Sequence, residues 1–115
     1  GDFAPGWVGL RMAIGETTMG GTTDFANQRL VFSVGDMYDV QINDGYSDSY
    51  CFQENHKYSV QLYDDGGLLM ESEINPTEMN YFAIDADDNA KFYRVVVWDL
   101  TENTRVSVSN PIWND

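Results

Sequence analysis

Apolar and polar residues alternate with a period of two along much of this 115-residue chain, and this pattern constrains its fold more than any other feature. Residues 30–34 read LVFSV and residues 93–97 read YRVVV, with a large apolar side chain at every second position. Successive side chains of a β-strand point to opposite faces, so the pattern predicts strands with one buried face. No stretch sustains the period of about 3.6 residues that marks a helix. The sequence therefore predicts an all-β protein.

Turn signals divide the alternating pattern into about seven strands, at the spacing typical of an antiparallel sandwich. The Asp-Gly pair within 64–67 predicts a tight hairpin between its two neighbouring strands. Residues 15–28 are rich in Gly and Thr, which predicts a loop. The strands flanking Gly35 are either two strands or one strand with a bulge. The segments expected to form strands are 7–14, 29–34, 37–42, 57–63, 68–74, 80–84, 92–99 and 105–109.

One face of these strands is expected to form the core. The segments 92–99 and 105–109 are expected to form the last hairpin. Pro111 follows this hairpin and cannot donate a hydrogen bond to a strand ladder, so it should end or kink the final strand where the sheet runs out. The expected core residues are Leu30, Phe32, Val60, Leu62, Tyr93, Val95, Val97, Val106 and Val108.

Length and composition predict a single globular domain over residues 1–115. Hydrophobic residues make up 43% of the chain and aromatic residues 14%, which is enough for a core without a metal or a disulfide. No apolar run approaches the ~20 residues that span a bilayer, so we expect no transmembrane segment, and we expect no signal peptide at the start. Cys51 stands alone and forms no intrachain disulfide.

Acidic residues dominate the charge of the protein. Asp and Glu number 19 against 6 Lys and Arg, which leaves a formal net charge of -13. A charge of this sign repels phosphate backbones and anionic membranes, so we expect no nucleic-acid partner. It suits cation-rich or extracellular settings. We therefore favour a bacterial extracellular or periplasmic location over a cytoplasmic one, without assigning a compartment.

An acidic loop over 85–89 is the one candidate for a metal. Asp85, Asp87, Asp88 and Asn89 follow the Asp-x-Asp-x-Asn start of a calcium loop. The glycine of that pattern is replaced by Ala90, and the bidentate acid would fall on Val96, so the match stops halfway. We interpret these residues as a solvated turn that holds calcium weakly at most.

No arrangement of residues predicts catalysis. The segment 15–22 has phosphate-loop spacing, but Gly21 stands at the lysine position and no helix is expected to follow. His56 is the only histidine and lacks the partners of a zinc cluster or a serine triad. We therefore expect a structural histidine, no catalytic residue and no cofactor.

Tryptophans supply the candidate interaction residues. Trp98 falls on the same strand face as Phe92 and Arg94, opposite the face expected to be core, and Arg94 is placed to lie over an aromatic ring. Large rings that exceed the needs of a small core indicate a surface packed on a neighbour. We expect such a surface to include Trp7, Trp98 and Arg94. A second interpretation is a sugar platform formed by Trp7, Trp98, Trp113, Tyr46 and Tyr50.

The two ends of the chain carry a family resemblance. The segments FYRVVVWD (92–99) and RVSVSNPIWND (105–115) resemble the closing hairpin of the immunoglobulin-like domain that follows the catalytic barrel in some PHP-type metal-dependent phosphoesterases. The segment WVGLRMAIGETTMGG (7–21) is similar to the entry of that domain. The resemblance implies an immunoglobulin-like sandwich excised from the C-terminus of a longer protein, and Gly1 at the first position fits a linker from the barrel.

The same resemblance implies an accessory domain rather than an enzyme. The family's metals are held by barrel residues that begin with a His-x-His pair, and this chain has one histidine, so no catalytic residue is carried over. The implied partner is the preceding catalytic domain of the same polypeptide. Two other classes remain open: a carbohydrate-binding module, which would show exposed coplanar rings, and a calcium-stabilised extracellular surface module.

Overall fold

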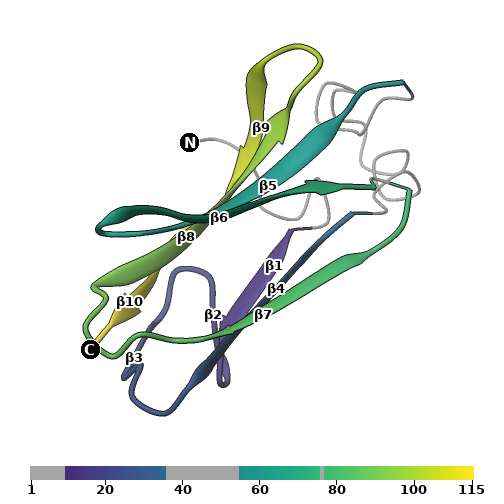
Figure 1. The fold of residues 1–115 in the computed structure, drawn as a ribbon. Helices are drawn as coiled ribbons and strands as arrows, with labels where there is room; N and C mark the ends of the chain where they lie inside the picture. The colour runs from purple at the N-terminus through teal and green to yellow at the C-terminus, as the bar shows by residue number, and fades with distance from the viewer. Residues whose placement is uncertain (1–9, 36–54, 76) are drawn as a thin grey trace.

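The computed structural model describes residues 10–35, 55–75 and 77–115, and this part of the chain is all-β. Two sheets lie face to face as two layers (Figure 1). The predicted β-sandwich is therefore confirmed. The strand expected over 37–42, the start of the one expected over 7–14, and the residues Trp7, Tyr46 and Tyr50 lie outside the described residues.

The first layer, sheet A, has the strand order β2-β1-β4-β7, and all its neighbours are antiparallel. The second layer, sheet B, has the order β3-β10-β8-β5-β6, with β9 also paired to β8. Sheet A comprises β1 (Arg11–Ile14), β2 (Thr17–Thr18), β4 (Arg29–Val34) and β7 (Asn80–Asp85). Sheet B comprises β3 (Thr22–Thr23), β5 (Tyr58–Asp64), β6 (Gly67–Ile74), β8 (Phe92–Asp99), β9 (Thr104–Val108) and β10 (Ile112–Asn114).

The inner faces of the two sheets form one core. Phe25, from the connection between β3 and β4, packs its ring against Tyr93 with the centroids 5.3 Å apart. The hairpin predicted from the Asp-Gly pair is present as β5 and β6, with Gly67 at φ 121° at the start of β6. Seven of the nine expected core residues are buried: Leu30, Phe32, Val60, Leu62, Tyr93, Val95 and Val97.

The other two expected core residues lie on β9, and here the prediction is wrong in detail. Val106 packs against the core only partly, and Val108 is half-buried and outside the core cluster. The register explains why, because Val97 pairs with Ser107 while Trp98 pairs with Arg105, which leaves Val106 as an extra residue. This irregularity turns Ser107 inward, and Ser107 is 1% exposed.

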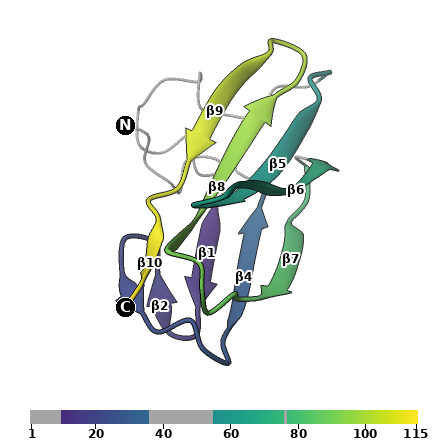
Figure 2. The same ribbon diagram turned by 60° about the vertical axis from the view of Figure 1, so that its left-hand side comes forward.

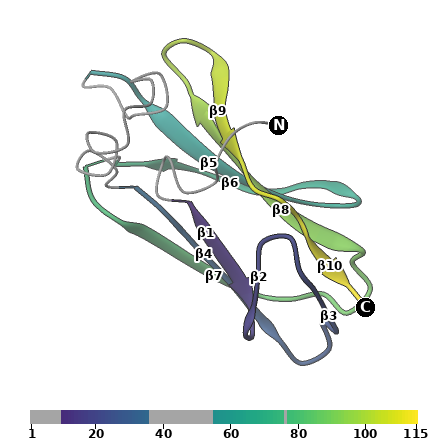
Figure 3. The same ribbon diagram turned by 180° about the vertical axis from the view of Figure 1, so that it is seen from behind.

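Pro111 interrupts the last strand without ending the sheet. β9 stops at Val108, and the chain resumes as β10 along the same edge of β8 (Figures 2 and 3). At the break, the Ser109 hydroxyl accepts a hydrogen bond of 2.9 Å from the Val95 amide, and the Ser109 amide donates to the Val95 carbonyl oxygen at 2.8 Å. The Ser109 side chain thus replaces the ladder bond that the kinked backbone does not make.

The final residues fasten the two sheets at one end. β10 pairs parallel with β3, and the backbone amides of Trp113 and Asp115 donate to the carbonyl oxygens of Gly21 and Thr23. The Asn114 amide group donates to the Asp88 and Ala90 carbonyl oxygens, at 3.0 and 2.7 Å. Its oxygen accepts a bond of 3.1 Å from the Phe25 amide. The C-terminal segment therefore connects loops from both sheets.

Two buried serines on the same segment allow a matched test of the Ser109 bond. Ser109→Ala leaves the buried Val95 amide without a partner, so we expect a loss of about 1–3 kcal/mol in the free energy of unfolding. Ser107→Ala removes a buried hydroxyl that has no hydrogen-bond partner in the structure, so we expect no loss of stability or a small gain. Urea unfolding of both variants measures the difference. Equal losses would contradict the role given to Ser109.

Candidate interaction surface

The outer face of sheet B gathers aromatic side chains around an arginine. On β8, Phe92, Arg94 and Trp98 occupy alternate positions that face away from the core residues Tyr93, Val95 and Val97. The register brings two further rings alongside, because Tyr63 pairs with Arg94 and Trp113 pairs with Phe92. We call Phe92, Arg94, Trp98, Tyr63 and Trp113 the aromatic face. Of the sequence-predicted surface residues, Arg94 and Trp98 share this face, and Trp7 lies outside the described residues.

The two ends of the aromatic face differ in accessibility. At the Trp98 end, Ser59 and Val96 are 2% and 6% exposed, and the Trp98 indole nitrogen is buried without a hydrogen-bond partner. Trp98 itself is half-buried, so this end offers less accessible surface than the other. At the other end Trp113 is 45% exposed. The accessible part is therefore the end formed by Phe92, Arg94 and Trp113, which we call the open end.

The open end is ordered by contacts between its own side chains. The Arg94 guanidinium carbon lies 5.9 Å from the centroid of the Phe92 ring, which is the cation–π contact that the sequence suggested. The Phe92 and Trp113 rings are 5.3 Å apart with their planes at 60°. A guanidinium that lies over an aromatic ring does not use its N–H groups as hydrogen-bond donors in that contact. The Arg94 donors therefore remain available to a partner.

A row of hydrogen bonds borders the face at Tyr63. The Tyr63 hydroxyl donates to the Gln61 side-chain oxygen at 2.8 Å, and the Gln61 amide donates to the Glu71 carboxylate at 2.7 Å. This chain across β5 and β6 holds the phenol ring in place and engages the nearby carboxylate. A rigid apolar surface carrying Arg, Trp and Tyr matches the residue types that dominate protein–protein binding energy.

Trp113 lies away from Trp98, the other described tryptophan of the sugar platform that the sequence suggests. The structure places Trp113 beside Phe92, at the end of the face that Trp98 does not reach. The signal that places it is the register across the Pro111 break. An alternation pattern cannot supply that register, because the kink resets the count of residues.

The acidic loop 85–89 does not bring its carboxylates together. Asp85 is 3.6 Å from the Arg29 guanidinium, and both side chains are exposed. The Asp87 carboxylate accepts a bond of 2.9 Å from the Asn89 amide, which is a turn-forming contact. Asp88 presents its backbone carbonyl oxygen to Asn114. Across residues 10–35, 55–75 and 77–115, no three His, Cys, Asp or Glu side chains are placed to hold a metal ion.

We predict that this loop binds calcium weakly at most. Asp87 already serves the turn, and a calcium site gains its strength from several oxygens that converge on one point. Isothermal titration calorimetry of the chain with calcium chloride should show no saturable heat at micromolar concentrations. Stoichiometric micromolar binding that Asp87→Asn abolishes would overturn this prediction.

Tyr93 connects the same loop to the core. Its side chain is 1% exposed, and its hydroxyl oxygen accepts a bond of 2.7 Å from the Asp87 amide. Burial raises the pKa of the Tyr93 phenol above its ordinary value of 10.0, the Asp87 amide lowers that pKa, and the Asp87, Asp64 and Asp65 carboxylates raise it. The net direction is upward, so the folded state favours the neutral phenol.

This raised pKa predicts an alkaline loss of stability. The folded-state pKa lies above the unfolded value of about 10, so the Tyr93 contribution is complete below that pH and disappears as pH rises through the folded pKa. Wild-type protein should therefore lose more unfolding free energy between about pH 9 and about pH 11 than Tyr93→Phe. Tyr81→Phe, on the solvent side of β7, controls for the loss of one phenol. Parallel curves for wild type and Tyr93→Phe would contradict the assignment.

His56 has a structural partner. Its Nδ1 lies 2.7 Å from the Asp99 carboxylate, whose other oxygen accepts bonds of 2.9 and 3.0 Å from the Thr101 and Glu102 amides. Asp99 is 2% exposed, so these bonds satisfy a buried charge. Together they fasten the start of β5 to the turn between β8 and β9. No serine, threonine or cysteine within the described segments is hydrogen-bonded to His56, and the geometry supports a clamp.

The fold and its surface define a β-sandwich with one open aromatic end. Comparison with known protein families, with curated proteins and with solved structures gives no match for this chain. In the part of the chain that the structure describes, no helix is long and apolar enough to cross a bilayer. Function is therefore inferred from the surface geometry and from the sequence patterns of the two ends.

Proposed function

We propose that this chain is a non-catalytic accessory domain that docks on the catalytic barrel of a PHP-type metal-dependent phosphoesterase in the same polypeptide. The observation that carries the proposal is the open end, where Trp113 is 45% exposed beside Phe92 and Arg94. An exposed tryptophan next to a stacked arginine is the side-chain combination that most often anchors a protein interface. Contacts between domains of one chain are of moderate area and partly polar, which a surface of this kind suits.

The strand order supports the immunoglobulin-like part of this proposal. Among the longer strands, β1, β4 and β7 form one sheet, and β6, β5, β8 and β9 form the other. Immunoglobulin-like sandwiches divide their strands between two sheets in this alternating way. The fourth strand, β6, pairs with the third, β5, as the additional C′ strand does in variable-type domains.

The motif near the end of the sequence, residues 109–112, also has a structural role. In the segment SNPI, Ser109 satisfies the Val95 amide, Pro111 sets the kink, and Ile112 is fully buried. Ser109, Pro111 and Ile112 thus each contribute to the path of the last strand along the β8 edge. This supports the view that the resemblance in residues 92–115 reflects a shared structure rather than shared composition.

Ring geometry favours a protein neighbour over a carbohydrate. Sugar platforms stack a flat ring face on coplanar aromatics, whereas the Phe92 and Trp113 planes meet at 60°. Tilted rings with an arginine over one of them fit an irregular protein surface better. A calcium-stabilised surface module is the other alternative, and the calcium titration of the 85–89 loop tests it directly.

We predict that the open end controls association with the catalytic domain. The full reading frame should encode an upstream barrel with a His-x-His pair, and that barrel should bind the chain in calorimetry when the two are supplied separately. Arg94→Glu should weaken this association by about tenfold or more, because it reverses an exposed charge at the centre of the contact. Lys57→Glu, the same charge change outside the open end, should leave it unaltered.

The isolated chain should show no phosphatase, esterase or glycosidase turnover above background with added divalent metals. Metal-dependent hydrolysis that a substitution within the chain abolishes would overturn the proposal. So would a reading frame that encodes nothing beyond these residues except a signal peptide. If Arg94→Glu and Lys57→Glu bind the barrel equally well, the choice of surface is wrong.

A further inference from the structure

The outer face of sheet A, on the other layer of the sandwich, carries a groove with a different chemistry. Two rows of side chains cross its strands. One row consists of small residues and one valine: Thr18, Ala13, Val31 and Ala83, paired in that order across β2, β1, β4 and β7. The adjacent row consists of Arg11, Ser33 and Tyr81, paired across β1, β4 and β7.

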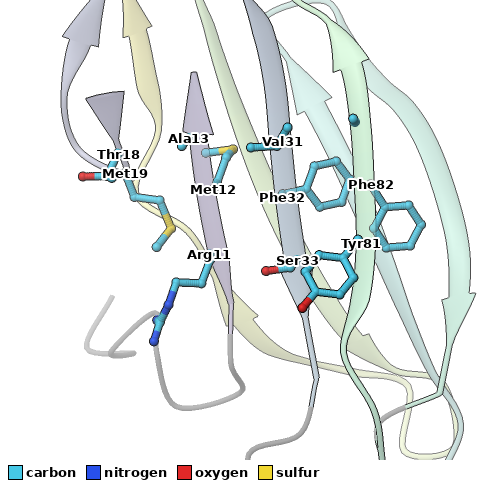
Figure 4. Close-up of a pocket in the computed structure, with 11 residues that line it drawn as sticks. Arg11, Met12, Ala13, Thr18, Met19, Val31, Phe32, Ser33, Tyr81 and Phe82 are labelled. Atoms are coloured by element: carbon cyan, nitrogen blue, oxygen red, sulfur yellow. The ribbon is translucent and has the colours of Figure 1, made fainter. Parts of the chain in front are cut away.

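The small row forms the floor of the groove. The side chains of Ala13, Val31 and Ala83 are shorter than those of Met19 and Tyr81, which also line the groove (Figure 4). The resulting space has a volume of about 480 Å³, within the range of small-molecule sites. Neighbouring strands lie about 4.8 Å apart, so three strand spacings make the floor about 14 Å long. This is an apolar trough that suits an elongated molecule.

One side of the trough is lined by hydrogen-bond donors. Arg11, Ser33 and Tyr81 lie in sequence along it, with Ser33 between the other two (Figure 4). A guanidinium can only donate, and both hydroxyls are able to donate. Among the described residues, no carboxylate lines the trough. The donors of this row therefore favour an anionic acceptor.

Arg11 differs from the other arginine on this face. Arg29, at the opposite end of β4, lies 3.6 Å from the Asp85 carboxylate, whereas Arg11 has no ion pair or hydrogen bond within the described part of the chain. A positive group with no ion pair among the described residues is unexpected on a protein with a formal net charge of -13. The group expected to pair with Arg11 is therefore a negative charge on a ligand.

We propose that this trough binds a small amphipathic monocarboxylate, with its apolar body over Ala13, Val31 and Ala83 and its carboxylate at Arg11 and Ser33. The groove is large enough for a small molecule, and Arg11 can pair with one negative charge. A second copy of the chain is a poorer occupant, because two bodies of charge -13 repel each other. The site is independent of the aromatic face, since the two lie on opposite sheets.

Octanoate is the probe for this site, and backbone amide NMR of the whole chain is the measurement. Saturable shifts should appear in β1, β4 and β7 and not on β8. Octanol carries a comparable chain without the charge, and acetate carries the charge without the chain, so both should bind more weakly. Arg11→Gln should weaken octanoate binding about fivefold, which is the scale of one exposed ion pair.

Arg29→Gln is the matched control, because it makes the same change on the same face at an arginine that already has an acidic partner. It should bind octanoate as wild type does. Ala83→Leu, which adds bulk at an exposed position of the floor, should weaken binding without unfolding the chain. Equal binding of octanol and octanoate, an unchanged affinity in Arg11→Gln, or shifts confined to sheet B would overturn the proposal. A dimer that buries the trough and excludes octanoate would overturn it as well.

Discussion

Burial of the inner face of β8 is the constraint on which the rest of this structure depends. Tyr93, Val95 and Val97 are at most 1% exposed, and they meet residues from both sheets in one core. A strand in this position needs backbone partners along both edges, because an unpaired buried amide is costly. β5 supplies one edge, and the other is shared by β9, the Ser109 hydroxyl and β10. The kinked ending of the chain is thus a consequence of how β8 is buried.

The same constraint creates the candidate surface. Once alternate residues of β8 face the core, Phe92, Arg94 and Trp98 must point outward, and their pairing partners on β5 and β10 point outward with them. Alternation over a single strand was enough to predict that Arg94 and Trp98 share a face. It was not enough to predict which end is accessible. That depends on which residues of the outer face are buried, as Ser59 and Val96 are.

The local sequence pattern did not predict features that depend on pairing between distant segments. β2, β3 and β10 have two or three residues each, too few to show any period. β3 and β10 form because distant partners complete their hydrogen bonds, whereas β2 pairs with the neighbouring β1. The loop expected over 15–28 therefore contains two short strands. On β9 an extra residue shifts the inward position from Val108 to Ser107, which alternation alone cannot foresee. The trough is similar, because Arg11, Ser33 and Tyr81 become neighbours only through the register of sheet A.

The distribution of charge determines which groups a ligand meets on the two outer faces. On β6, an edge strand in the described sheet, Glu71 and Glu73 are exposed, and such charges discourage edge-to-edge pairing. Other acids occupy the turns at 64–65 and 85–88. The net charge acts weakly beyond the screening length of about 8 Å at physiological salt, so a ligand at a sheet face responds mainly to nearby groups. At the open end that group is Arg94, and in the trough it is Arg11. Each is a cation without an ion pair among the described residues and lies beside apolar side chains.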